Sequence, residues 1–227
     1  MTFDDGFKSF FTNAIPILEK HQIPAIIFLN MGPIRGETNW PGLIDYLCRR
    51  QKFIDYLKTY VELEKIDDSP HLSCSQLIVE RYIENEKEDI HELVSHYVGD
   101  FADETDLECA SRHPYTFYGN HTHTHLVSSL ITNEELLNDV RKNSELLKEY
   151  PNYIDYFAFP FGQPGRTFTQ DQVQLLLDSG IKKVFSSSGS LNQKPSASFL
   201  DRISLISGDD SPNKIRFRVL KSWLSKL

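Results

Sequence analysis

The segment PAIIFLN, Pro24–Asn30, is a short and unbroken apolar run. A run of this length is typical of a strand buried on both faces, as in parallel sheets that helices cover. Before it, apolar residues from Phe7 to Leu18 recur at helical spacing, and Pro16 is expected to kink or divide that helix. The run therefore predicts a strand of an α/β sheet that follows an acidic turn and a helix.

The same alternation of strands and helices returns later in the chain. Apolar spacing predicts helices over 133–149, over about 169–179 and in the closing stretch NKIRFRVLKSWLSKL. Alternation of this kind indicates parallel strands joined by helical crossovers, and therefore an α/β sheet or barrel. The later predicted strands are YTFYGN (115–120), DYFAFPFG (155–162), IKKVFSSS (181–188) and RISLIS (202–207).

The segment from about 36 to 114 interrupts this alternation. Two long stretches in it, 40–66 and 75–98, have helical spacing, and nothing between them resembles a core strand. We expect a helical insertion after the second strand. It either packs as a cap on one end of the sheet or forms a lid that shapes substrate access, and insertions at a catalytic rim do both.

Composition limits the classes of function. The 227 residues fit one large domain, because α/β barrels reach this size without splitting. The net charge of −8 argues against a nucleic-acid partner, and no apolar run is long enough for a membrane span. Cys48, Cys74 and Cys109 are too widely spaced to indicate a disulfide framework or a zinc ribbon. No secretory signal precedes Thr2, which favours a cytoplasmic protein unless the N-terminus is processed.

The segment GNHTHTH contains three closely spaced histidines, His121, His123 and His125, which are candidate metal ligands. All three would face one side of an extended segment, whereas only His121 and His125 would share a face of a helix. Imidazoles and a carboxylate are the usual ligands of zinc and related divalent ions, and a catalytic site keeps one position open for water. Strand ends of a parallel barrel converge on one face, so the pair Asp4 and Asp5 can supply the third ligand and a free base. A nearby cation would also offset the repulsion between the two carboxylates.

These motifs resemble the polysaccharide deacetylases of carbohydrate esterase family four. Thr2–Gly6 matches the first family motif, T-F-D-D-G, and His121–His125 matches the second, H-[S/T]-x-x-H. Phe159–Gly162 resembles the end of the third motif. The resemblance implies a distorted (β/α)7-type barrel, with 1–227 as a single catalytic domain apart from its helical insertion. It also implies removal of N-acetyl groups from a sugar with a divalent metal, expected to be zinc, with cobalt, nickel or manganese as alternatives.

The resemblance also implies roles for individual residues. Asp4 corresponds to the general base, while Asp5, His121 and His125 correspond to the metal ligands. The main-chain N–H of Phe161 corresponds to the group that faces the oxyanion. We therefore expect an N-acetylated glycan of the cell surface, or its precursor, as the substrate.

The sequence also departs from the family pattern. The third motif lacks its initial Arg, and no His follows His125 to protonate the departing amine. Arg202 can replace the missing Arg beside the base. Thr122 matches the Ser or Thr that braces the loop, and His123 occupies the variable position with no implied role. The strand before Asp4 is also unusually short.

These departures leave two alternatives to a sugar deacetylase. The first is a hydrolase of the same fold that acts on an amide outside sugars, as some relatives do with small cyclic amides. The second is a degraded relative that binds a glycan or a metal with little activity.

Overall fold

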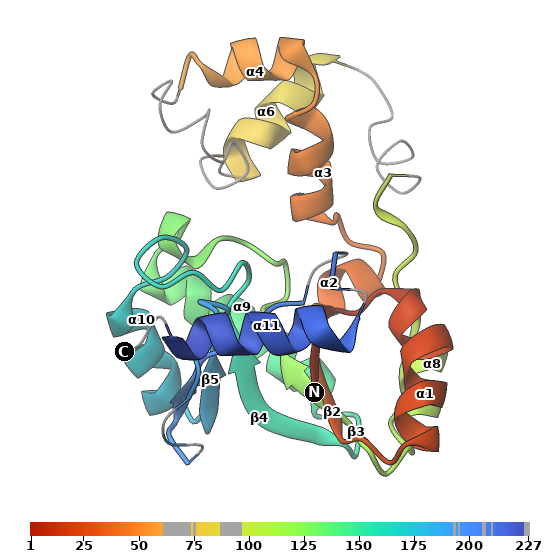
Figure 1. The fold of residues 1–227 in the computed structure, drawn as a ribbon. Helices are drawn as coiled ribbons and strands as arrows, with labels where there is room; N and C mark the ends of the chain where they lie inside the picture. Colours follow the sequence, from red (N-terminus) through yellow and green to blue (C-terminus); the bar gives the residue numbers. More distant parts are fainter. Residues whose placement is uncertain are drawn as a thin grey trace.

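The computed structural model describes residues 1–60, 74, 76–86, 97–192, 194, 196–205, 208, 209 and 211–224. Six strands of this part of the chain form one parallel sheet, and their order in space follows their order in the chain. The strands are β1 (Thr2–Asp5), β2 (Ala25–Leu29), β3 (Thr116–Asn120), β4 (Tyr153–Ala158), β5 (Lys183–Phe185) and β6 (Phe199–Leu200) (Figure 1).

Most helices begin where the sequence pattern predicts them. Thr132 and Glu135 form a capping box at the start of α9, and Thr169 with Gln172 does the same for α10. Pro16, which has no N–H to donate, stands where a π-helical turn gives way to an α-helix. The described helices are η1 (Phe10–Ala14), α1 (Ile15–Lys20), α2 (Met31–Ile34), α3 (Trp40–Leu47), α4 (Gln51–Leu57), α6 (Gln76–Glu86), α8 (Glu104–Ala110), η3 (Ser128–Leu130), α9 (Asn133–Leu147), α10 (Gln170–Asp178) and α11 (Pro212–Leu224).

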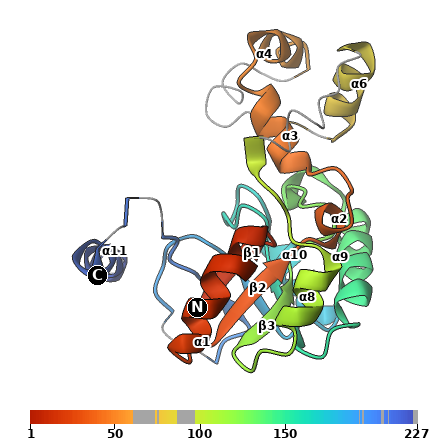
Figure 2. The same cartoon turned by 90° about the vertical axis from the view of Figure 1, so that its right-hand side faces the viewer.

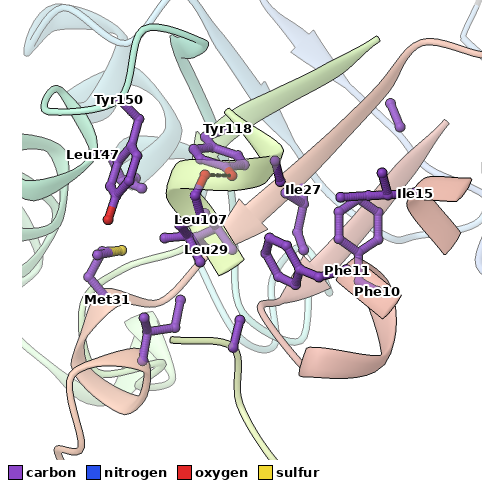
Figure 3. Packing of buried hydrophobic residues seen from close by; sticks show 14 of the residues in the cluster. Phe10, Phe11, Ile15, Ile27, Leu29, Met31, Leu107, Tyr118, Leu147 and Tyr150 are labelled. Carbon is purple, nitrogen blue, oxygen red and sulfur yellow. Dashed lines mark hydrogen bonds between the residues drawn. The ribbon is translucent and has the colours of Figure 1, made fainter. Parts of the chain in front are cut away.

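Alternate residues of the strands pack on opposite faces of the sheet. Ile27 and Leu29 of β2 join Tyr118 in an apolar layer beneath the N-terminal helices (Figure 3). The buried hydroxyl of Tyr118 donates to the carbonyl of Leu107 at 2.6 Å, which fixes α8 on this layer (Figure 3). Phe28, between the two β2 residues, packs with Phe185 on the concave face. The apolar run that predicted β2 is therefore buried on both sides.

The sheet is a curled half-barrel rather than a closed ring. Its edge strands, β1 and β6, pair only with β2 and β5, but Arg202, just after β6, contacts Asp4 of β1. We expected a strand over RISLIS, and this was wrong for residues 202–205, which form no strand. Arg202 donates its main-chain N–H to Ser186 and its carbonyl accepts from Gly189, but both partners lie in the loop after β5, which ends at Phe185. The described residues contain six strands, compared with the seven that the family resemblance implied.

The segment between β2 and β3 contains α2, α3, α4, α6 and α8. Side chains of α3, α4 and α6 build a hydrophobic cluster of their own, centred on Leu47, Phe53 and Tyr82. These helices lie beyond one end of the sheet (Figure 1). Much of the predicted insertion, namely 61–73, 75 and 87–96, lies outside the described residues. No helix in the described part of the chain has the length and apolar character to cross a bilayer.

Candidate metal centre

The predicted site residues meet at the carboxyl ends of β1, β3 and β4, which belong to the same parallel sheet. Asp4 and Asp5 end β1, the loop that holds His121 and His125 follows β3, and Phe161 follows β4. Strands that run parallel deliver their ends to one edge of the sheet. Asp5 and the two histidines are more than a hundred residues apart in the sequence, but the fold brings them into direct contact.

Asp5, His121 and His125 form a three-ligand cluster. Asp5 Oδ1 lies 3.0 Å from His125 Nε2 and 3.5 Å from His121 Nε2. One ligand atom from each residue can be chosen so that all lie within 4.8 Å of one another. His121 Nδ1 is 2.7 Å from the carbonyl oxygen of Ala158, which only accepts, so Nδ1 carries the proton and Nε2 presents its lone pair to the cluster.

The chemistry of this cluster fits a divalent cation. Asp5 Oδ1 is a buried oxygen that makes no hydrogen bond, although His125 Nε2 is so close. A carboxylate oxygen and imidazole nitrogens at these separations can be ligands of one shared ion. Burial works to raise the pKa of Asp5, but attraction to His125 and His121 outweighs it and holds the pKa well below its usual range. Asp5 is therefore ionised at neutral pH, which is the form that binds a metal.

The backbone around the cluster is strained. Asp5, Thr122, His125 and Phe161 have φ angles of 75°, 66°, 56° and 60°, and they are four of the five residues other than glycine with positive φ in the described chain. Each such conformation costs about 1 to 3 kcal/mol and persists only where surrounding contacts enforce it. One such contact is the hydroxyl of Thr122, which accepts the N–H of His125 at 3.0 Å. The loop is bent at this point, so it is neither the extended strand nor the helix considered from sequence.

Asp4 has a different partner from its neighbour. The guanidinium of Arg202 donates to both oxygens of Asp4, at 2.5 and 2.9 Å, and its Nε donates to the carbonyl of Ser186 at 3.1 Å. A bidentate pair of this kind fixes the plane of the carboxylate as well as its charge. Asp4 Oδ2 also lies 3.9 Å from His121 Nε2, so Asp4 stands beside the three-ligand cluster.

His123 points away from the cluster. Its side chain is 1% exposed, and its Nε2 is 2.9 Å from Glu37 Oε2, while Lys142 Nζ is 3.1 Å from Glu37 Oε1. Burial works to raise the pKa of Glu37, but these two partners lower it below its usual value. Glu37 precedes α3, so this contact joins the histidine loop to the start of the predicted insertion.

A cavity of about 450 Å³ opens over the cluster. Asp5, His125 and Phe161 line it on the side of the sheet. Residues of α3 and its surroundings also line it, namely Asn39, Pro41, Gly42, Asp45, Tyr97 and Val98. The hydroxyl of Tyr97 donates to Asp45 at 2.7 Å, which orients the ring.

Comparisons with known proteins agree on the architecture. No family model and no curated protein matches the sequence. Among solved structures, IcaB from Ammonifex degensii is 16% identical, with 97% of this chain and 71% of that chain covered and a TM-score of 0.58. The deacetylase PplD of Streptococcus pyogenes, in complex with acetate, is 13% identical, with coverages of 96% and 68% and a TM-score of 0.58. A de-N-acetylase from Aggregatibacter actinomycetemcomitans is 13% identical, with coverages of 96% and 73% and a TM-score of 0.56.

The chain has the fold of the polysaccharide deacetylases. At these identities the likeness concerns the fold alone. In this chain the fold brings together the ends of β1, β3 and β4, which carry the aspartates, the histidine loop and Phe161.

Sequence reasoning missed three buried asparagines that hold the histidine loop in this deacetylase fold. Asn30 donates to the carbonyls of His121 and Thr122, and Asn120 Oδ1 accepts the N–H of Thr122 at 2.8 Å. Asn143 of α9 donates to Asn120 Oδ1 at 3.0 Å. One signal was available, because Asn143 lies on the apolar face of its helix, where a polar residue needs a buried partner.

A histidine that acts as general acid would have to come from the segment between β2 and β3, where His113 pairs with Glu19 at 3.4 Å near the opposite end of β3. His71, His91 and His96 lie outside the described residues.

Proposed function

We propose that this chain is a metal-dependent hydrolase that removes N-acetyl groups from a sugar of a cell-surface polysaccharide or its precursor. The observation that carries the proposal is the cluster of Asp5, His121 and His125 beside an Asp4 that Arg202 clamps, at the carboxyl edge of a deacetylase fold. Residues 1–227 would act as a single catalytic domain.

Asp5, His121 and His125 would hold the ion. Two imidazoles and one carboxylate suit zinc, and the same set suits cobalt, nickel or manganese. The ion, when bound, lowers the pKa of water and polarises the amide carbonyl.

Asp4 is the base in this proposal, and it accepts a proton from the attacking water. The bidentate contact with Arg202 holds the carboxylate in a fixed plane. Since none of the described histidines outside the cluster and its loop lies at this edge, Asp4 then returns the proton to the amine nitrogen as the C–N bond breaks. The N–H of Phe161 would stabilise the oxyanion. Arg202→Ala should lower kcat without changing metal content, because only the orientation of Asp4 is lost.

The helices around α3 would act as a lid. The cavity over the cluster is shared between the sheet and this segment, so a substrate in it would touch both. A volume of about 450 Å³ lies in the usual range for small-ligand sites. The segment would therefore shape substrate access rather than act only as a stabilising cap.

The decisive experiment is release of acetate from a chitin-type oligosaccharide, with added zinc or cobalt. We expect turnover that a chelator abolishes and that either metal restores, and turnover by Asp4→Asn that is lower by about a hundredfold or more under the same conditions. Metal binding without acetate release from any N-acetylated oligosaccharide would refute the proposal and favour the degraded relative.

An amide outside sugars is the second candidate. Several walls of the cavity are apolar, including Phe7, Pro33, Val98 and Phe101, and such walls suit a small apolar amide. Small cyclic and acyl amides assayed beside the oligosaccharide separate the two substrates. Hydrolysis of the small amides alone would replace the sugar in the proposal but keep the residue roles.

A further inference from the structure

Helix α11 has a composition unlike that of the rest of the chain. Pro212–Leu224 contains four of the 24 basic residues, Lys214, Arg216, Arg218 and Lys221, and none of the 32 acidic ones. The remainder of the chain is therefore more acidic than the net charge of −8 indicates. The helix is a cationic segment attached to an acidic body.

Four large apolar side chains of α11 are exposed. Phe217 is 67% exposed, Trp223 51%, Leu220 48% and Val219 40%. Phe217 and Leu220 are three residues apart and Val219 and Trp223 are four apart, so these side chains form one broad side of the helix. Lys214, Arg218 and Lys221, also spaced by four and three, follow one border of that side.

The opposite side of α11 faces the barrel. Ser222 is buried, and its hydroxyl donates to the carbonyl of Gly189 in the loop after β5. Arg218 pairs with Asp209 at 2.6 Å. Since Ser222 lies about half a turn from Phe217 and Leu220, these contacts direct the apolar side outward. Figure 2 shows α11 on a different side of the molecule from α3, α4 and α6.

We propose that α11 lies in the interface of an anionic lipid surface and attaches the chain to it. A helix with Trp, Phe and Leu on one side and Lys or Arg along its border is the arrangement that binds such surfaces. The cations complement anionic headgroups, and Arg216, between Trp223 and Leu220, can extend its charged end outward. A second copy of the chain is a weaker occupant, because protein interfaces are depleted in Lys and two lysines border this side.

The acidic body gives this attachment an orientation. An anionic surface repels the rest of the chain, so contact is confined to α11. The cavity over the cluster, which residues of α3 line, then stays open to the surroundings.

The test is sedimentation of the full chain with vesicles, which requires no substrate and so stands apart from the proposed function. One vesicle type is phosphatidylcholine alone, and the other contains equal amounts of phosphatidylcholine and phosphatidylglycerol. We expect binding to the second type only, with loss of binding in high salt. A blue shift of tryptophan fluorescence should accompany binding, because Trp223 enters a less polar environment.

Two pairs of variants test the charged and the apolar parts separately. Lys214→Ala with Lys221→Ala should weaken partitioning by about 30-fold, since each cation near such a surface contributes about 1 kcal/mol. Phe217→Ser with Leu220→Ser should weaken it by about tenfold or more. Two matched controls change exposed residues elsewhere and should leave partitioning to the vesicles unchanged. They are Lys20→Ala with Lys148→Ala for the charged pair, and Ile17→Ser with Leu77→Ser for the apolar pair.

Several results would overturn the proposal. Failure of the unaltered chain to bind anionic vesicles is one, and equal weakening by the control variants is another. A third is a chain that does not bind vesicles but forms a concentration-dependent dimer by analytical ultracentrifugation, where Phe217→Ser with Leu220→Ser abolishes the dimer. That result would assign the apolar side to a second copy. Thermal unfolding of each variant shows whether a lost signal reflects the surface or the fold.

Discussion

Two adjacent aspartates acquire different partners because the backbone turns between them. Asp4 is the third residue of β1 and points to Arg202, whereas Asp5, at φ 75°, turns into the space between His121 and His125. Neighbouring residues of a strand face opposite ways, and the left-handed turn at Asp5 changes the direction of the chain at that point. Each carboxylate therefore has its own partners, Arg202 for Asp4 and the two histidines for Asp5, and these contacts offset the repulsion between the carboxylates.

This separation predicts opposite outcomes for two matched substitutions. Asp4→Asn should keep the metal and lower turnover by about a hundredfold or more, the usual scale for loss of a general base. Asp5→Asn should lower metal affinity directly, because it removes the one anionic ligand. Metal content by mass spectrometry and acetate release measure the two effects. If Asp4→Asn lost the metal and Asp5→Asn kept it, the roles would have to be exchanged.

The histidines of the loop predict a second contrast. His121→Ala and His125→Ala should each abolish metal binding and activity, because each removes a ligand. His123→Ala should keep the metal, but it should lower the free energy of unfolding by about 1 to 3 kcal/mol, because a buried partner of Glu37 is lost. Calorimetric titration with zinc and thermal unfolding measure the two properties. Equal loss of zinc binding in all three variants would contradict the ligand assignment.

Sequence alone predicted the residues of the cluster, but not what supports them. Asp4, Asp5, His121 and His125 carry chemistry that is visible in their residue types. Asn30 and Asn143, in contrast, act through contacts that only the fold creates. Asn30 donates to the backbone of the histidine loop, about ninety residues away. Asn143 contacts the side chain of Asn120 and the backbone at the end of β2 and just after it. Arg202 was expected beside Asp4 only because the family position for an Arg was empty.

At the scale of elements, apolar runs were reliable where a strand is covered on both faces. Ala25–Leu29 and Thr116–Asn120 lie inside the runs that predicted them. The expected late strand does not form over residues 202–205, because β5 ends at Phe185 and the partner of a strand cannot be read from its own sequence.

The helices of the predicted insertion give a testable prediction about packing. Burial raises the pKa of Cys48 and of Cys74 to about 12, whereas Cys109 of α8 is exposed. At pH 8 each buried thiol has about a thousandfold less thiolate than an ordinary thiol with a pKa of about 8.5. Iodoacetamide should therefore modify Cys109 alone in the native protein and all three after unfolding, as mass spectrometry would show. Fast modification of Cys48 and Cys74 in the native protein would mean that α3, α4 and α6 do not form a closed core.

At the scale of the whole molecule, three parts are arranged in ways that local patterns do not encode. The barrel provides the cluster, the segment around α3 provides part of the cavity wall, and α11 lies elsewhere on the surface. Helical spacing predicted that the segment around α3 is helical, but its position over the cluster depends on long-range contacts such as that between Glu37 and His123.

The shared cavity predicts a division between binding and turnover at Tyr97. Its ring lines the same cavity as Asp5 and His125, and its hydroxyl is held by Asp45, so it can contact the sugar but lies outside the cluster. Tyr97→Ala should raise KM for a chitin-type oligosaccharide about tenfold, the scale for loss of one aromatic contact, with kcat little changed. Tyr97→Phe should be milder because the ring remains. Tyr60→Ala is the matched control, since Tyr60 is exposed and is not among the cavity-lining residues. If Tyr97→Ala lowered kcat and left KM unchanged, the segment would act on the chemical step, and its role as a lid that selects substrate would be wrong.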